Sequence, residues 1–201
     1  MKTIFIPTKR KFPEFNINKF PIKKLPKKFF LVYTIQYKDI ADKLKNKFKS
    51  IKKSQQILGC SKLSTKLPIL YIGDGTFHIT NLYTQNSKIY TYNIYNNKIT
   101  KIPKSDIIKQ KNKLKGKLSK FYSSKTIGIL VSTKKGQYNI VIANKLKKQL
   151  EKQNKKAYIL ISNNININEL ENFPNIEFYI NTACPRIQDD SNNIIDYQLI
   201  N

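Results

Sequence analysis

Short apolar runs alternate with amphipathic, lysine-rich stretches along most of this chain. The run Phe29-Phe-Leu-Val-Tyr33 is typical of a strand buried on both faces, and Thr34-Ile-Gln-Tyr37 closes it. A helix is indicated next, because apolar residues recur at helical spacing at Ile40, Leu44, Phe48 and Ile51. Further strands are predicted at 56–58, 69–72, 89–93 and 98–100, with a turn at 96–97 between the last two. A polar helix over 105–120, interrupted at Gly116, then connects to the rest of the chain.

The same plan returns in the second half of the sequence. A buried strand is predicted at 126–131, and a helix over 140–153 places Ala143, Leu146 and Leu150 on one face. Strands at 157–161 and 177–180 follow, with a helical turn at 168–172 between them. Strands that alternate with helices favour a parallel sheet. We therefore expect an α/β fold of two similar three-layer units with mainly parallel sheets, at 29–122 and 123–201.

Residues 1–28 differ from both units. Thr3-Ile-Phe-Ile6 has the pattern of a short strand, and Pro13, Pro21 and Pro26 then punctuate a lysine-rich stretch. Proline neither donates to a sheet nor continues a helix. The segment is interpreted as a linker, or as a remnant strand of a sheet whose other strands lie elsewhere. Because a lone strand is not stable, that sheet could belong to another chain.

The charge is the most unusual property of the composition. Lys and Arg number 38 against 12 Asp and Glu, which gives a net charge of +26, yet Arg10 and Arg186 are the two arginines. Such a surplus attracts phosphate backbones and acidic protein surfaces, but specific phosphate and base recognition favours the bidentate guanidinium. Lysine, isoleucine and asparagine all have AT-rich codons. Compositional drift is therefore favoured over nucleic-acid binding and over an acidic protein partner.

The sequence also indicates the cellular compartment. No apolar run approaches the ~20 residues of a membrane span, and Met1–Lys11 lack the apolar stretch of a signal peptide. We expect a cytoplasmic protein that does not contact a membrane. Its two cysteines exclude a disulfide framework and are expected to be reduced thiols.

Residues with reactive or coordinating side chains follow the predicted strands. In an open α/β sheet, functional groups gather at the carboxyl ends of the parallel strands. The candidates at these positions are Cys60, Cys184, His78, Gln36 and Gln137, with Arg186 beside the second cysteine. Each has a structural alternative, because a cysteine is often a small buried apolar residue and a lone histidine is often structural. No Ser-His-Asp triad, P-loop or paired glutamates can be assembled, so nothing favours a hydrolase or a kinase.

Four segments together resemble a known family. They are Thr34-Ile-Gln-Tyr37, Gln56-Ile-Leu-Gly-Cys60, Tyr71-Ile-Gly-Asp-Gly-Thr-Phe-His78, and the pair Val131-Ser-Thr-Lys-Lys-Gly-Gln137 and Asn181-Thr-Ala-Cys-Pro-Arg-Ile187, the last followed by Asp189-Asp190. In this order and spacing they resemble the archaeal diphthamide synthases. These are non-classical radical-SAM enzymes that make 2-(3-amino-3-carboxypropyl)histidine on translation elongation factor 2.

This resemblance implies a cofactor and a site. The family has three similar α/β domains, each of which gives one cysteine to a single 4Fe–4S cluster. Cys60 matches the ligand of the second domain and Cys184 that of the third. Three thiolates leave one iron open for the amino-acid end of S-adenosylmethionine, whose 3-amino-3-carboxypropyl group is transferred after electron transfer from the cluster. Gln36, His78, Gln137 and Arg186, chosen for their places at strand ends, are expected to line the S-adenosylmethionine pocket.

The sequence departs from the family pattern in three places. The first domain and its cysteine have no counterpart, Thr76 stands where we expect an arginine, and the segment from Arg186 to Asp189 is one residue short. We expect the carboxyl-terminal portion of a split enzyme, in a dimeric assembly with a chain that supplies the first domain and the third cysteine. The alternatives are a catalytically inactive accessory subunit and a basic RNA- or ribosome-binding module.

Overall fold

The computed structural model describes residues 12, 15–59, 61, 63–75, 78–84 and 88–200 of the chain. They belong to two compact units, residues 1–111 and 112–201. The strand expected at Thr3–Ile6 and the cluster ligand expected at Cys60 lie outside the described residues. No helix in the described ranges is both long enough and apolar enough to cross a membrane.

The first unit contains a five-stranded sheet in the order β2-β1-β3-β4-β5. The first four strands of this order pair in parallel, and β5 pairs antiparallel with β4. The turn between β4 and β5 contains Asn97, whose φ of 51° is in the left-handed region that asparagine tolerates. The elements are β1 (Phe29–Tyr33), α1 (Lys38–Lys47), β2 (Ile51–Gln56), β3 (Ile69–Ile72), β4 (Ile89–Asn93) and β5 (Lys98–Lys101).

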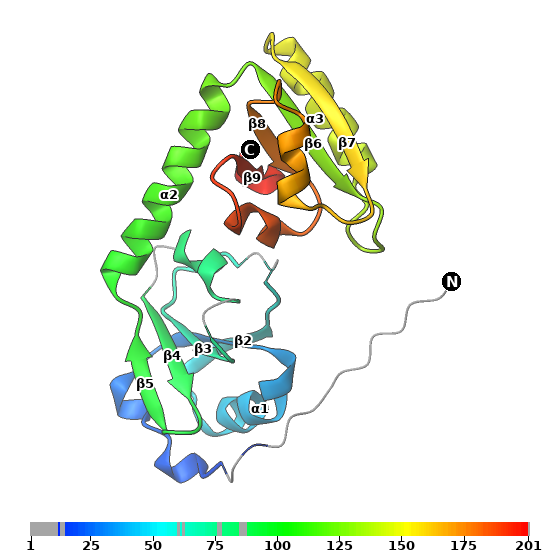
Figure 1. Ribbon diagram of the computed structural model, residues 1–201. Helices are drawn as coiled ribbons and strands as arrows, with labels where there is room; N and C mark the ends of the chain where they lie inside the picture. Colours follow the sequence, from blue (N-terminus) through cyan, green and yellow to red (C-terminus); the bar gives the residue numbers. More distant parts are fainter. Residues whose placement is uncertain are drawn as a thin grey trace. The chain divides into compact units, whose positions relative to one another are not determined.

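Apolar side chains cover both faces of this sheet. On one face, Leu31 of β1 packs with Leu44 of α1, which lies against β1 and β2 (Figure 1). Phe20, from the segment before β1, is buried in the same cluster. On the other face, Val32 packs with Ile79 and other residues of the loops. Short 3-10 helices complete the unit: η1 (Ile17–Lys19), η2 (Ile22–Lys24), η3 (Ile35–Tyr37) and η4 (Thr80–Thr84).

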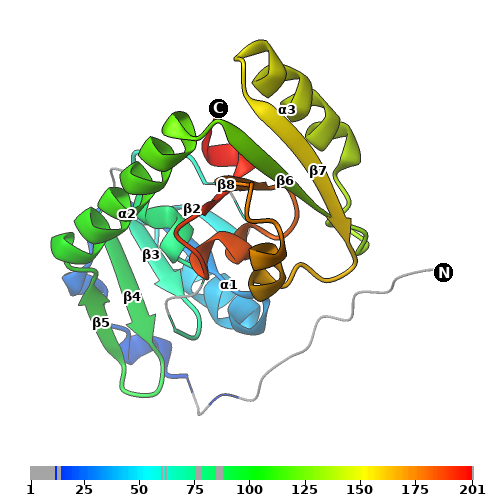
Figure 2. The ribbon, with the colours of Figure 1, turned by 45° about the horizontal axis from the view of Figure 1, so that its top comes forward.

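The second unit contains a four-stranded sheet whose neighbouring strands are all parallel, in the order β7-β6-β8-β9. Helix α3 lies against β6 and β7 (Figure 2) and contributes Ala143, Leu146 and Leu150 to the core, as the sequence predicts. The elements are α2 (Lys104–Ser123), which begins in the first unit, β6 (Thr126–Ser132), α3 (Ile140–Lys152), β7 (Lys156–Ser162), η5 (Ile167–Asn172), β8 (Phe178–Asn181), η6 (Pro185–Asp189), β9 (Ile194–Asp196) and η7 (Tyr197–Leu199).

The two sheets share a topology. In each, the first strand lies between the second and the third, and the fourth follows the third, so that β1, β2, β3 and β4 correspond to β6, β7, β8 and β9. The expected α/β class with parallel-dominated sheets is confirmed. This topology brings the segments that follow the first and third strands of each unit to one edge of its sheet.

Several element boundaries differ from the sequence predictions. The strand expected at 56–58 occupies Ile51–Gln56, and α1 ends at Lys47, so Ile51 opens a strand rather than continuing the helix. Residues Ile35–Tyr37 form the 3-10 helix η3, with Thr34 as its N-cap residue, instead of closing the strand. Helix α2 runs through Gly116 without interruption. Strand β9 was not predicted, because its three residues, Ile194–Asp196, form too short a pattern.

Candidate functional site

In the first unit, the segments that leave β1 and β3 are joined at the carboxyl edge of the sheet. Half-buried Gln36 lies in η3, directly after β1. Its neighbour Tyr37 donates a hydrogen bond from Oη to Oδ1 of Asp74, at 2.6 Å, in the loop after β3. The backbone N–H of Ile57, just after β2, donates to the carbonyl of Tyr33 at 2.8 Å. The edge where Gln36 and Asp74 lie is therefore fixed by bonds among the strand exits.

The chain bends at Gly73-Asp74-Gly75, and a larger residue is disfavoured at each of the two glycines for a different steric reason. A Cβ atom on Gly73 would lie 2.2 Å from the hydroxyl oxygen of Tyr71. Gly75 has a φ of +59°, which most side chains disfavour. Burial raises the pKa of Tyr71, with the carboxylate of Asp74 as a smaller cause, so its hydroxyl stays protonated near neutral pH. His78 is half-buried shortly after this turn, whereas Thr76 lies outside the described residues.

In the second unit, a buried asparagine shapes the loop that carries Cys184. Asn181 ends β8 with none of its surface exposed. Its Oδ1 accepts a bond from the N–H of Ala183 at 3.0 Å, and its Nδ2 donates to the carbonyl of Cys184 at 2.8 Å. The amide of Asn181 thus bridges the turn from within, as asparagine does in Asx turns. Cys184 is half-buried and not in a disulfide, and it is the N-cap residue of η6.

Thr182 connects this cysteine loop to the segment after β6. Its Oγ1 and backbone N–H both donate to the carbonyl of Leu130, at 2.8 and 3.0 Å. Its own carbonyl accepts a bond from Nδ2 of Asn139 at 2.6 Å. Gln137 lies half-buried in the segment between β6 and Asn139. The structure therefore brings the loops of Gln137 and Cys184 together at one edge of the second sheet.

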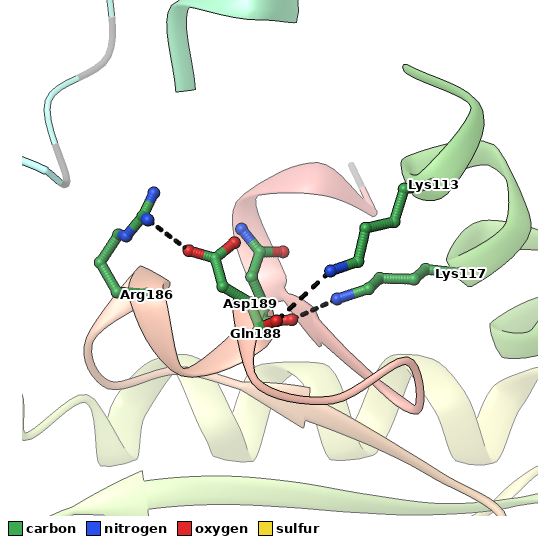
Figure 3. A network of polar contacts seen from close by, with 5 residues as sticks. All are labelled: Lys113, Lys117, Arg186, Gln188 and Asp189. Carbon is green, nitrogen blue, oxygen red and sulfur yellow. Dashed lines mark hydrogen bonds and ion pairs between the residues drawn. The ribbon is translucent and has the colours of Figure 1, made fainter. Parts of the chain in front are cut away.

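Arg186 lies in η6 and forms an ion pair with Asp189. Its Nη2 is 2.7 Å from Oδ2 of Asp189, and both side chains are mostly buried. From the other side, Lys113 and Lys117 of α2 donate to the carbonyls of Asp189 and Gln188 (Figure 3). The guanidinium is therefore held on a segment that is bonded at both its side chains and its backbone.

The donor atoms available for a metal cluster are few. The sequence contains two cysteines, and Cys184 is the one within the described residues. There, no group of three or more His, Cys, Asp or Glu side chains could hold a metal ion. A half-buried cysteine at a strand exit suits a thiolate ligand. Within the described residues, Cys184 is therefore the side chain that fits an iron–sulfur cluster.

Comparison with known proteins identifies the family. A sequence model described as "Putative diphthamide synthesis protein" matches residues 1–197, nearly the whole chain. The chain belongs to this diphthamide synthesis family. The 2-(3-amino-3-carboxypropyl)histidine synthase of Methanocaldococcus jannaschii is 32% identical over 165 residues, which are 80% of this chain and 46% of that protein. The Pyrococcus horikoshii synthase is 32% identical over 136 residues, which are 66% of this chain and 39% of that protein.

Solved structures of the diphthamide synthesis family agree with this assignment. Dph2 from Pyrococcus horikoshii, determined with a 4Fe-4S cluster, matches with a TM-score of 0.73 and 28% sequence identity. The match covers 89% of this chain and 57% of that one. The chain thus spans about half the length of the family members it matches. The resemblance drawn from the four sequence segments is confirmed at the level of family and fold.

Some residues at this edge of the sheet were not singled out as functional from the sequence. Asn181 and Thr182 lie in the quoted family segment, and their position directly before Cys184 is the sequence signal that could have assigned them a positioning role. Asn139 had no comparable signal. Lys117 had none either, because it is one of many lysines and its partner, Gln188, lies 71 positions away.

Proposed function

We propose that this chain forms the second and third domains of a 2-(3-amino-3-carboxypropyl)histidine synthase. The reaction is transfer of the 3-amino-3-carboxypropyl group of S-adenosylmethionine to a histidine of translation elongation factor 2, in the cytoplasm. The observation that carries the proposal is the loop from Asn181 to Cys184. It displays a thiol at the carboxyl edge of a sheet, in a chain that matches a Dph2 determined with a 4Fe-4S cluster.

In this proposal Cys60 and Cys184 are the thiolate ligands of the cluster that come from this chain. The third thiolate comes from polypeptide that supplies the portion of the relatives with no counterpart in these 201 residues. When bound, the cluster supplies the electron that breaks the bond between the sulfonium and the γ-carbon of S-adenosylmethionine. The hydrogen bonds of Asn181 to the carbonyl of Cys184 and the N–H of Ala183 hold the backbone of the loop that carries this thiol, and Cys184 would be the ligand that the loop supplies to the cluster.

The remaining candidate residues would bind the co-substrate. Arg186 suits the carboxylate of S-adenosylmethionine, because guanidinium binds carboxylate with two parallel hydrogen bonds. Its ion pair with Asp189 limits the directions in which the guanidinium can point. Gln36, His78 and Gln137, which also lie at strand exits, are the other candidates for hydrogen bonds to the polar groups of S-adenosylmethionine. If single alanine substitutions at these four positions caused no loss of S-adenosylmethionine binding, the pocket would lie elsewhere.

We further propose a dimeric assembly in which the third thiolate comes from polypeptide other than these 201 residues. The support is the cysteine count, because two thiolates do not complete the three-ligand site that the family resemblance implies. A catalytically inactive accessory subunit is the competing function, and the same cysteine count favours it. Iron content distinguishes the two.

The deciding experiment is anaerobic iron and sulfide analysis of the chain alone and together with a candidate first-domain chain. We expect iron in the mixture at about four atoms per cluster, with a brown absorbance that Cys60→Ala and Cys184→Ala each abolish. Lys148→Ala, on the exposed face of α3, is the matched control and should keep the iron. If both cysteine variants kept the absorbance of the parent mixture, the ligand assignment would be refuted. If no mixture contained iron, the accessory subunit would be favoured.

A further inference from the structure

Three lysines on one side of α2 contact the segment that follows the cysteine loop. Lys113, Lys117 and Lys120 are spaced four and three residues apart, so they share a helix face. Lys113 donates from Nζ to the carbonyl of Asp189 at 3.3 Å, and Lys120 donates to Oδ1 of Asn193 at 3.0 Å. Between them, Lys117 donates to the carbonyl of Gln188 (Figure 3).

Lys117 is the buried member of the three. It is 5% exposed, whereas Lys113 and Lys120 are exposed. Its neighbours on α2, Leu114, Leu118 and Phe121, pack into the core of the second unit. An apolar side chain at this position would avoid the desolvation of an ammonium group. A buried ammonium group needs an acceptor inside the protein, and the carbonyl of Gln188 accepts its hydrogen bond.

The bond of Lys117 fixes the end of η6, the short helix that directly follows Cys184. Helix η6 begins directly after Cys184, which is its N-cap residue, and carries Arg186. Asn181 anchors the start of η6 through the carbonyl of Cys184. Gln188 anchors its end twice, because its carbonyl accepts from Lys117 and its Oε1 accepts from the N–H of Asp196 at 3.1 Å. Loss of the ammonium leaves a backbone carbonyl at the end of η6 without this donor.

We propose that Lys117 is a positioning residue, whose ammonium group holds η6 in the conformation that presents Cys184 and Arg186 at the edge of the second sheet. The role of these two residues in binding the cluster and S-adenosylmethionine rests on the proposed function. The conformation of η6 itself does not, so it can be measured without cluster or co-substrate.

The first test measures how fast a thiol reagent modifies Cys184 in the full chain with Cys60→Ser, which leaves one thiol. Lys117→Met keeps the length and helix propensity of the side chain but removes the donor. We expect it to speed the modification about tenfold, the effect of losing one hydrogen bond from a charged donor. Lys117→Arg, which restores a donor, should return the rate toward that of the parent. Lys117→Leu, which also lacks a donor, serves the same purpose if the Met variant does not fold.

Two controls separate positioning from general stability. Lys113→Met removes the exposed neighbour and should leave the rate within about twofold, because exposed charges contribute little. Leu150→Ala opens the core under α3, away from the contacts of η6, and lowers stability by cavity formation. Its rate should match the parent under native conditions. An unchanged rate in the Lys117 variants, or an equal rise in Leu150→Ala, would overturn the proposal.

The second test uses the assembled, cluster-loaded enzyme. Lys117→Met should raise the Kd for S-adenosylmethionine about tenfold, with rescue by Lys117→Arg, while the iron content separates loss of the cluster from loss of the pocket. If the thiol rates change as expected but no mixture binds iron, Lys117 positions η6 and the proposed function fails. If iron binds and the thiol rates are unchanged, the proposed function stands and the role of Lys117 is wrong.

Discussion

Among single residues, Asn181 has the largest expected effect on the cysteine loop. Its amide satisfies the N–H of Ala183 and the carbonyl of Cys184 in a fully buried position. Asn181→Ala leaves both groups without these bonds, so we expect the free energy of unfolding to fall by about 1–3 kcal/mol. Urea denaturation followed by circular dichroism measures this loss. Asn144→Ala, exposed on α3, is the control, and an equal effect there would contradict the role of Asn181.

Lys117 is expected to make stability depend on pH in a defined window. Burial lowers its pKa to about 8, with Lys113 as a smaller cause, while Asp189 and Asp190 oppose the shift. Because the pKa is lower in the folded than in the unfolded chain, the unfolded state binds more protons between about pH 8 and 10.5. The contribution of Lys117 to the free energy of unfolding therefore increases as pH rises through this window. Below the window, the charge is buried in the folded chain and its desolvation lowers stability by the full amount.

The measurement is the difference in unfolding free energy between the parent and Lys117→Met at pH 7, 8.5 and 9.5. We expect this difference to move in favour of the parent as pH rises above 8, by on the order of 1 kcal/mol per pH unit. Tyrosines with raised pKa values, such as Tyr92 at about 12, titrate in both proteins and cancel in the difference. A difference that stays constant across the three pH values would mean that Lys117 does not titrate in this window.

At the scale of elements, two glycines are expected to respond in opposite directions to the same substitution. A Cβ on Gly128 in β6 would lie 2.6 Å from the ring of Tyr179 on the neighbouring strand, whereas one on Gly116 in α2 meets nothing within 4 Å. Gly128→Ala should therefore destabilise the second unit by about 1–3 kcal/mol through overpacking. Gly116→Ala should stabilise α2 by about 0.5–1 kcal/mol. Thermal unfolding compares them, and stabilisation by both substitutions would refute the close approach at Gly128.

The elements that the sequence predicts well are those buried on both faces. Strands β1, β3 and β6 are continuous apolar runs, and their positions agree with the prediction. Strand β2 is different because it is an edge strand with mostly exposed side chains, so its apolar signal was the buried residue after it, Ile57. Likewise, the proline pattern before residue 29 gave no sign that Phe20 is buried in the first unit.

At the scale of the whole molecule, the repeated strand order explains why the sequence could indicate where the candidate residues lie in each sheet. Segments after the first and third strands meet at one sheet edge in each unit, which is where Gln36, Gln137 and Cys184 were expected and lie. Contacts between residues far apart in sequence were not predictable in this way. Lys117 and Gln188 meet because the carboxyl-terminal part of α2 and η6 both belong to the second unit, and no local pattern of the chain encodes that pairing.

The net charge of +26 leads to the last prediction, which concerns nucleic acid. Lysines are exposed on α1, β2, α2 and α3, and several have structural roles. Lys155, for example, donates to the carbonyls of Tyr122 and Ser124 at the end of α2. A charge distributed in this way fits compositional drift better than a built interface, because specific binding needs clustered and bidentate contacts.

We therefore expect binding to an unrelated single-stranded RNA to be weaker than about 1 μM at 150 mM salt, within the range of non-specific attraction. Fluorescence anisotropy between 50 and 300 mM salt measures it, with a polylysine of similar charge as the control. Binding by the chain should be no tighter than binding by this control. Tight binding at physiological salt that falls steeply as salt is added would instead favour a basic RNA-binding module, because only many ordered phosphate contacts give both properties.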